Sequence, residues 1–127
     1  MTKRNEVYVC EICGNMVEVV HAGGGSLVCC GQPMKLLEEN VVDAAVEKHV
    51  PVVTRDGDKL RVQVGSVPHP MIPEHFIEWI ELISPAGVVR KSLKPGDAPE
   101  VEFCAVPDGD WIVRAYCNLH GLWKDQK

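Results

Sequence analysis

The residues that could do chemistry in this 127-residue chain are its six cysteines and five histidines, which fall into separate regions. Four of the cysteines stand in the first quarter as two close pairs, Cys10 with Cys13 and Cys29 with Cys30. A Cys-x-x-Cys spacing lets one tight turn bring two sulfurs to a single ion, and the second pair can supply two more. The pattern predicts a tetrahedral site of four thiolates, which is compatible with zinc or with iron.

The adjacent pair Cys29-Cys30 needs a bend in the backbone, because neighbouring residues of a regular strand point to opposite faces. Gly31 follows directly and permits such a bend. Two alternatives are a thioredoxin-like redox motif, which would need a surrounding βαβ pattern, and a disulfide between the adjacent cysteines, which geometry and compartment disfavour. We expect His21 to be an ordinary loop residue, because four sulfurs already complete the metal's shell.

A second set of metal-binding residue types lies in the rest of the chain. Cys117 and His120 are again three residues apart, and three more histidines stand near the ends of expected strands: His49, His69 and His75. A lone histidine in such a place is usually a surface or hydrogen-bonded residue. If these five side chains converge, four neutral imidazoles and one thiolate suit iron better than zinc, which usually takes four ligands, and a sixth position would stay open.

These ligands must be positioned by β-structure. Short β-type runs between turn signals predict strands at residues 6–9, 16–20, 50–54, 60–64, 76–83, 88–93, 101–106 and 111–116. Five or more such strands in about ninety residues are typical of an antiparallel β-sandwich, and no segment has a sustained helical stripe. The sequence therefore predicts an all-β protein with little helix. Cys104 falls inside an expected strand, so we expect a partly buried thiol there.

The composition predicts two domains, residues 1–37 and 38–127. The first is Gly-rich and too small to be held by burial alone, since domains under about 40 residues usually need a metal, a disulfide or a partner. It contains three basic and three acidic residues, so the net charge of −5 belongs to the second domain. This acidity argues against a nucleic-acid partner. With no signal-like start and no apolar run of roughly 18 residues, the sequence predicts a cytoplasmic protein without a membrane partner.

The motifs together resemble those of desulfoferrodoxin, the two-iron class of superoxide reductase, over essentially the whole chain. The four N-terminal cysteines, followed by Gly31-Gln32-Pro33-Met34, resemble the family's desulforedoxin-like iron centre. Four segments resemble its catalytic centre: Glu47-Lys48-His49-Val50-Pro51, His69-Pro70-Met71, Glu74-His75 and Cys117-Asn118-Leu119-His120-Gly121-Leu122-Trp123.

The resemblance implies two iron ions per chain, one Fe(Cys)4 and one Fe(His)4Cys. The first would be held by Cys10, Cys13, Cys29 and Cys30. The second would have His49, His69, His75 and His120 in an equatorial plane and Cys117 as axial ligand, on an immunoglobulin-like β-sandwich in a homodimer. The implied activity is the one-electron reduction of superoxide to hydrogen peroxide, without dismutation to dioxygen, in the detoxification that accompanies oxidative stress. A rubredoxin-like protein is the implied electron donor.

Two residues beside His49 are candidates for a role in catalysis. Lys48 is expected to steer the anion and supply protons, although most lysines are simply solvated. Glu47 is the family's candidate for capping the oxidised iron, and on an extended backbone residues i and i+2 lie on one side. The alternative functions are a non-catalytic iron electron-transfer protein, which would favour a saturated ligand shell, and a zinc-stapled binding module, which would contain no iron.

Overall fold

The fold is described from a computed structural model, for residues 1–104, 106 and 109–125. The chain divides into two compact units, Met1–Glu38 and Glu39–Lys127. Each unit is described by itself. Within the described residues, no helix is long and apolar enough to cross a membrane.

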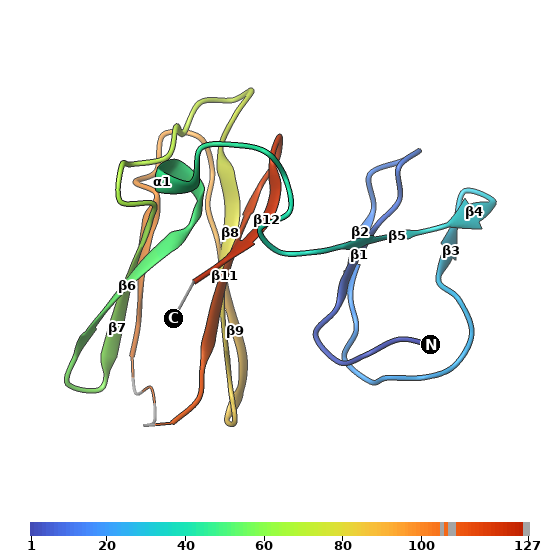
Figure 1. Ribbon diagram of the computed structural model, residues 1–127, viewed down its shortest axis with the longest axis horizontal. Helices are drawn as coiled ribbons and strands as arrows, with labels where there is room; N and C mark the ends of the chain where they lie inside the picture. Colours follow the sequence, from blue (N-terminus) through green and yellow to red (C-terminus); the bar gives the residue numbers. More distant parts are fainter. Residues whose placement is uncertain (105, 107–108, 126–127) are drawn as a thin grey trace. The chain divides into compact units, whose positions relative to one another are not determined.

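The first unit is made of five very short strands (Figure 1). A three-stranded antiparallel sheet has the order β2-β1-β5, and a separate hairpin pairs β3 with β4. The strands are β1 (Val7–Val9), β2 (Met16–Glu18), β3 (Val28–Cys29), β4 (Gln32–Pro33) and β5 (Lys35–Leu37). Few of its apolar side chains are buried, so burial alone stabilises this unit little.

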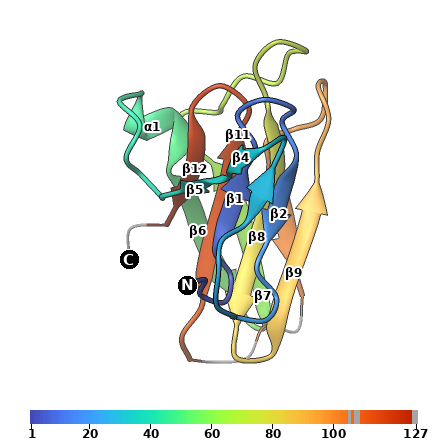
Figure 2. The same cartoon turned by 90° about the vertical axis from the view of Figure 1, so that its right-hand side faces the viewer.

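The second unit is a sandwich of two antiparallel sheets, with strand orders β10-β7-β6 and β12-β11-β8-β9 (Figures 1 and 2). Its strands are β6 (Pro51–Asp56), β7 (Lys59–Val64), β8 (Ile77–Ser84), β9 (Gly87–Ser92), β10 (Glu100–Phe103), β11 (Ile112–Cys117) and β12 (Gly121–Lys124). Read in chain order, one sheet contains the first, second and fifth strands and the other contains the third, fourth, sixth and seventh. This differs from the constant-type immunoglobulin arrangement only in the sheet that takes the fourth strand. The predicted all-β fold is therefore confirmed.

The core of the sandwich comes from alternate residues of both sheets. Most of its fully or nearly fully buried hydrophobic residues form one cluster: Leu60, Val62, Val64, Ile77, Ile80, Leu82, Phe103, Val106, Val113, Ala115 and Cys117. Each buried Val, Leu or Ile contributes about 1.5–3 kcal/mol relative to exposure. The candidate metal ligand Cys117 is part of this cluster, so its thiol is held by the packing of the core.

The structure differs from the sequence-based expectations in several elements. The single helical turn α1 (Val46–His49) was not predicted, nor were four of the strands: β3, β4, β5 and β12. The expected strand 101–106 is shorter, because β10 pairs with β7 only as far as Phe103, opposite Leu60, and β7 begins at Lys59. Cys104 therefore lies beyond the strand and is exposed, so the prediction of a partly buried strand thiol was wrong. Residue 105 of the expected strand lies outside the described residues.

Candidate metal centres

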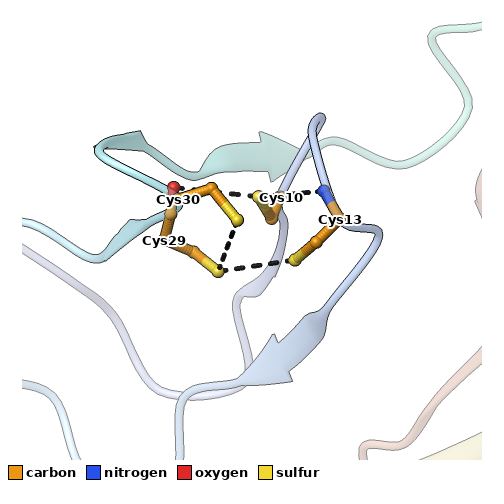
Figure 3. Close-up of side chains that lie close together, drawn as sticks. All are labelled: Cys10, Cys13, Cys29 and Cys30. Atoms are coloured by element: carbon orange, nitrogen blue, oxygen red, sulfur yellow. Dashed lines mark hydrogen bonds between the residues drawn. The ribbon is translucent and has the colours of Figure 1, made fainter.

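The four N-terminal cysteines converge on one point (Figure 3). Their sulfur atoms all lie within 4.8 Å of one another. Cys10 and Cys13 stand in the turn that follows β1, where Gly14 adopts a φ of +82° and its N–H donates to the Cys10 carbonyl at 2.9 Å. The N–H of Cys13 points at the Cys10 sulfur, 3.5 Å away.

The other two sulfurs come from the β3–β4 hairpin. Cys30 and Gly31 are its two turn residues and have φ values of +52° and +76°. Two successive left-handed residues make the tight turn of a two-residue hairpin, and this is the bend that lets adjacent cysteines face one ion. The bend that Gly31 was expected to permit therefore begins one residue earlier, at Cys30.

The thiols of this four-cysteine cluster differ in pKa. Backbone N–H groups of Cys13 and then Ile12 lower the pKa of the Cys10 thiol to about 6. Hydrogen bonds with Cys13, Cys10 and Cys29 raise the pKa of Cys30 to about 12. A first thiolate is stable in the metal-free cluster, but further negative charge in the same small space needs a cation. Four sulfurs in such an arrangement fit a tetrahedral metal ion.

The second set of residues gathers at one end of the sandwich. His49 closes α1, His69 and His75 lie in the loop between β7 and β8, Cys117 ends β11, and His120 lies in the turn to β12. Helix, loop and turn lie at the same end of the unit in both views (Figures 1 and 2). The ligand atoms of His49, His69, His75 and Cys117 lie within 4.8 Å of one another.

The four imidazole rings approach the corners of a square. Around the set, the centroid distances His49–His69, His69–His75, His75–His120 and His120–His49 are 4.7, 4.6, 5.0 and 4.9 Å. The opposite pair His49–His75 is 6.2 Å apart. Corners of a tetrahedron would be equidistant, so the longer diagonal indicates four ligands nearer to one plane than to a tetrahedron.

The ring nitrogens that face inward are spaced as ligands of one metal ion would be. The Nδ1 of His49 donates to the Ala45 carbonyl and that of His69 to the Pro70 carbonyl, both at 2.7 Å, so each neutral ring turns an unprotonated Nε2 inward. These two Nε2 atoms are 3.2 Å apart, and His49 Nε2 is 3.1 Å from His120 Nδ1. Ligands about 2.1 Å from one ion and at right angles to each other are about 3.0 Å apart.

His75 and Cys117 complete the argument for a metal ion. The Nε2 of His75 is buried and has no hydrogen-bond partner in the described part of the chain. The Cys117 sulfur is buried and 3.9 Å from His120 Nδ1. Burial raises the pKa of the Cys117 thiol, while the backbone N–H groups of Leu119 and His120 lower it. A bound cation would satisfy the orphaned nitrogen and stabilise the buried thiolate together.

The imidazoles are ready to bind metal at neutral pH. Burial lowers the pKa of His69 to about 4, and burial is also the largest cause that lowers the pKa values of His49 and His75. These rings are therefore unprotonated at neutral pH, as metal ligands must be. Imidazole nitrogens together with one sulfur form a donor set that suits iron.

Comparison with known proteins places the chain in a family. The desulfoferrodoxin family model matches residues 41–126, and the model of the desulfoferrodoxin N-terminal domain matches residues 2–37. The chain belongs to the desulfoferrodoxin family. It is 59% identical to a desulfoferrodoxin homolog from Archaeoglobus fulgidus, with 98% of each chain covered. It is 56% identical to a desulfoferrodoxin from Nitratidesulfovibrio vulgaris, again with 98% of each covered.

A solved structure extends the likeness to the fold. The crystal structure of the superoxide reductase from Treponema pallidum matches with a TM-score of 0.73 and 35% identity, covering 95% of this chain and 99% of that one. The two ligand sets, four cysteines in one unit and His49, His69, His75 and Cys117 with His120 in the other, are consistent with the two iron centres of a desulfoferrodoxin. The predicted pair of metal centres is confirmed.

The two remaining candidates, Glu47 and Lys48, are exposed on α1. Glu47 stands on a helical turn, where residues i and i+2 lie about 200° apart, and not on an extended backbone that would place it on the same side as His49. Both charges nevertheless affect the pKa values of histidines in the second metal centre. After burial, the Lys48 charge contributes to the lowered pKa of His49 and of His75, whereas Glu47 opposes this at His49.

Two residues that support the second centre were not predicted as such. Trp123 stacks on His49 with ring centroids 4.9 Å apart, and its Nε1–H donates to the His120 carbonyl at 3.0 Å. Gly65 lies against the backbone of α1, and a Cβ there would stand 2.5 Å from the Glu47 carbonyl oxygen. Trp123 belongs to the motif that begins at Cys117, but nothing local in the sequence marks Gly65.

Proposed function

We propose that this member of the desulfoferrodoxin family is a superoxide reductase. One superoxide, one electron and two protons give one hydrogen peroxide, with no release of dioxygen. The observation that carries the proposal is the near-square set of four imidazoles with a buried thiol at Cys117. Five protein donors leave one position of an octahedral ion free for a small anion, which a purely electron-transferring site would not need.

A ferrous ion bound by these residues would supply the electron and act as a Lewis acid toward superoxide. The chain sets the charge of the site, because four neutral imidazoles add none and Cys117 adds one negative charge. A divalent ion with this ligand set has a formal charge of +1 and attracts an anion. The thiolate of Cys117 would donate electron density to a bound ion, which favours the reduction of superoxide.

We assign Lys48 the steering of superoxide and the supply of protons. Its ammonium group is exposed, yet its charge reaches His49 and His75. In a protein of net charge −5, a positive charge beside the site guides a small anion there and holds a proton at Nζ for the product. We assign Glu47 the capping of the oxidised site, since its carboxylate is the negative group whose charge reaches His49 from the same helical turn.

We further propose that the chain works as a homodimer in the cytoplasm. Residues 1–37 form a small Fe(Cys)4 domain and residues 38–127 the catalytic domain, with a rubredoxin-like protein as electron donor. The exposed apolar side chains of the first domain, among them Ile12 at 62% and Val28 at 61% exposure, favour association. A reducing compartment would keep the four thiols available to the metal.

Product stoichiometry tests the proposed reaction. The fully reduced, iron-loaded protein is given a known amount of superoxide, and hydrogen peroxide and dioxygen are measured together. We expect one hydrogen peroxide per superoxide and no dioxygen. Dioxygen at half the amount of superoxide would indicate dismutation, and loss of superoxide no faster than without protein would indicate a non-catalytic electron carrier. Either result would contradict the proposal.

A further inference from the structure

Asn118 joins two segments that each carry ligands of the second metal centre. It stands between Cys117 and His120 in the turn from β11 to β12. Its Oδ1 accepts from the N–H of Phe76 at 2.9 Å, and its Nδ2 donates to the carbonyl of Glu74 at 3.1 Å. Its backbone N–H donates to the Phe76 carbonyl at 3.2 Å. Both chain neighbours of His75 are therefore bonded to one residue.

The side chain of Asn118 takes the place of a main-chain hydrogen-bond partner at the end of the β8–β11 pairing. The β8–β11 ladder runs as far as Cys117 opposite Ile77, and Asn118 opposite Phe76 would be its next pair. The Asn118 N–H still makes a ladder bond, but the N–H of Phe76 bonds to the side-chain oxygen instead of the main-chain carbonyl. The backbone of Asn118 is thus free to turn toward His120, while the loop that bears His75 stays attached.

His75 needs this attachment more than the other loop and helix histidines do. The rings of His49 and His69 are each held by a hydrogen bond from Nδ1 to a backbone carbonyl. Across the described ranges, the ring of His75 makes no hydrogen bond; its backbone pairs with Ile72 in a tight turn, at 3.0 and 3.1 Å. The position of its imidazole therefore depends on how the backbone on either side is held.

We infer that Asn118 is a positioning residue that fixes His75 relative to Cys117 and His120 and thereby holds the second metal centre in its five-donor geometry. The inference rests on the metal centre of the proposed function, but not on superoxide as its substrate. An amide is required at this position, because one bond needs an acceptor and the other a donor. Aspartate would place a carboxylate against the Glu74 carbonyl, and alanine would leave both backbone groups without this partner.

Iron release measures this role without any turnover. The iron-loaded protein and its Asn118→Ala variant are mixed with a chelator of ferrous iron, and the loss from each centre is followed by its own absorption. We expect the second centre of the variant to lose iron about 10–100-fold faster, because the loss of a residue that orients a metal ligand typically lowers metal affinity by about 10–100-fold. The Fe(Cys)4 centre of the same chain should release iron at the wild-type rate.

Asn40→Gly is the matched control. The Asn40 side chain also makes two hydrogen bonds to a distant backbone, accepting from the N–H of Lys124 at 2.8 Å and donating to its carbonyl at 3.3 Å. It flanks no metal ligand, and glycine tolerates its φ of +60°. We expect this variant to lose stability without faster release at the second centre.

Three results would overturn the inference: wild-type release from Asn118→Ala, equal acceleration at both of its centres, or equal acceleration at the second centre of the Asn40→Gly control. If Asn118→Ala does not fold, Asn118→Asp gives the same comparison, because it keeps the acceptor for the Phe76 N–H and replaces only the donor to the Glu74 carbonyl, by a carboxylate oxygen. Its release should then fall between those of wild type and a site without His75, for which His75→Ala is the reference.

Discussion

The strongest evidence at the scale of single residues is a contact that neutral imidazoles do not make on their own. The Nε2 atoms of His49 and His69 are 3.2 Å apart, and both rings carry their proton on Nδ1. Two acceptors at this distance repel unless a cation lies between them. The metal site is therefore identified by inward-facing Nε2 atoms that carry no proton, which the residue types alone do not reveal.

Lys48→Ala should slow the capture of superoxide by about five-fold at low ionic strength, because a positive charge near the path of the anion is lost. The rate should also depend less steeply on salt. Rates are measured by pulse radiolysis over a range of ionic strengths. Lys59→Ala is the control, since it removes an equal charge in β7, at the end of the strand remote from the loop that carries His69. Equal rates for the two variants at every ionic strength would contradict steering by Lys48.

At the scale of elements, the strands were predictable because most of them follow one rule. β7 and β11 place alternate apolar residues in the core, and this period of two is visible in the sequence. β12 does not show this alternation, because its adjacent residues Leu122 and Trp123 are both buried, on opposite faces. The single turn α1 is too short to show a helical period.

The ligand sets were predictable as motifs, but their geometry was not. The spacing of Cys10 and Cys13 identifies a local turn. His75, in contrast, precedes β8 and Cys117 ends β11, so they are far apart in the sequence and meet only because β8 pairs with β11. The backbone conformation of Glu47 was not predictable for a related reason. Its backbone conformation is set by the loop packed against α1, including the Val67 N–H that donates to the Glu47 carbonyl at 2.9 Å.

Gly65→Ala should disturb α1 more than it disturbs the sandwich. The added Cβ would meet the Glu47 carbonyl oxygen at 2.5 Å, so α1 or the loop must shift, at a cost of about 1–3 kcal/mol. His49 ends this helix, and we therefore expect weaker iron binding at the second centre. The measurement is the iron content of each centre after dialysis against a chelator. Gly57→Ala, in the open β6–β7 turn, is the control for backbone strain without a clash. A second centre as fully loaded as wild type would contradict this account.

At the scale of the whole molecule, the two units depend on metal to different extents. The first has little core and should lose its order without metal, whereas the second has a continuous cluster of buried residues. The same burial lowers the pKa of His69 and makes the metal-free second unit sensitive to acid.

We predict that the metal-free second unit loses stability as the pH falls from about 6.5 to about 4. His69 has a pKa of about 4 when folded, against 6.5 for an ordinary histidine, so between these values the unfolded chain binds more protons. His49 and His75 act in the same direction, and Glu78 opposes them because burial raises its pKa. Tryptophan fluorescence follows this unit alone, since all three tryptophans lie in it: Trp79, Trp111 and Trp123.

His69→Gln separates the histidine from other titrating groups in that experiment, because glutamine keeps a polar side chain but does not titrate. The midpoint of thermal unfolding should fall less between pH 7 and pH 5 in the variant than in wild type. An equal fall in both proteins would show that His69 is not responsible.

The central claim is that superoxide reacts at the five-donor centre, and following which iron is oxidised tests it most directly. The fully reduced protein is exposed to a pulse of superoxide smaller than the amount of protein, and the absorption of the two centres is recorded separately. The account predicts that the second centre is oxidised in proportion to the superoxide supplied, that the Fe(Cys)4 centre is unchanged during this step, and that Cys117→Ser abolishes the reaction. Direct oxidation of the Fe(Cys)4 centre, or a Cys117→Ser variant that reacts as fast as wild type, would contradict it.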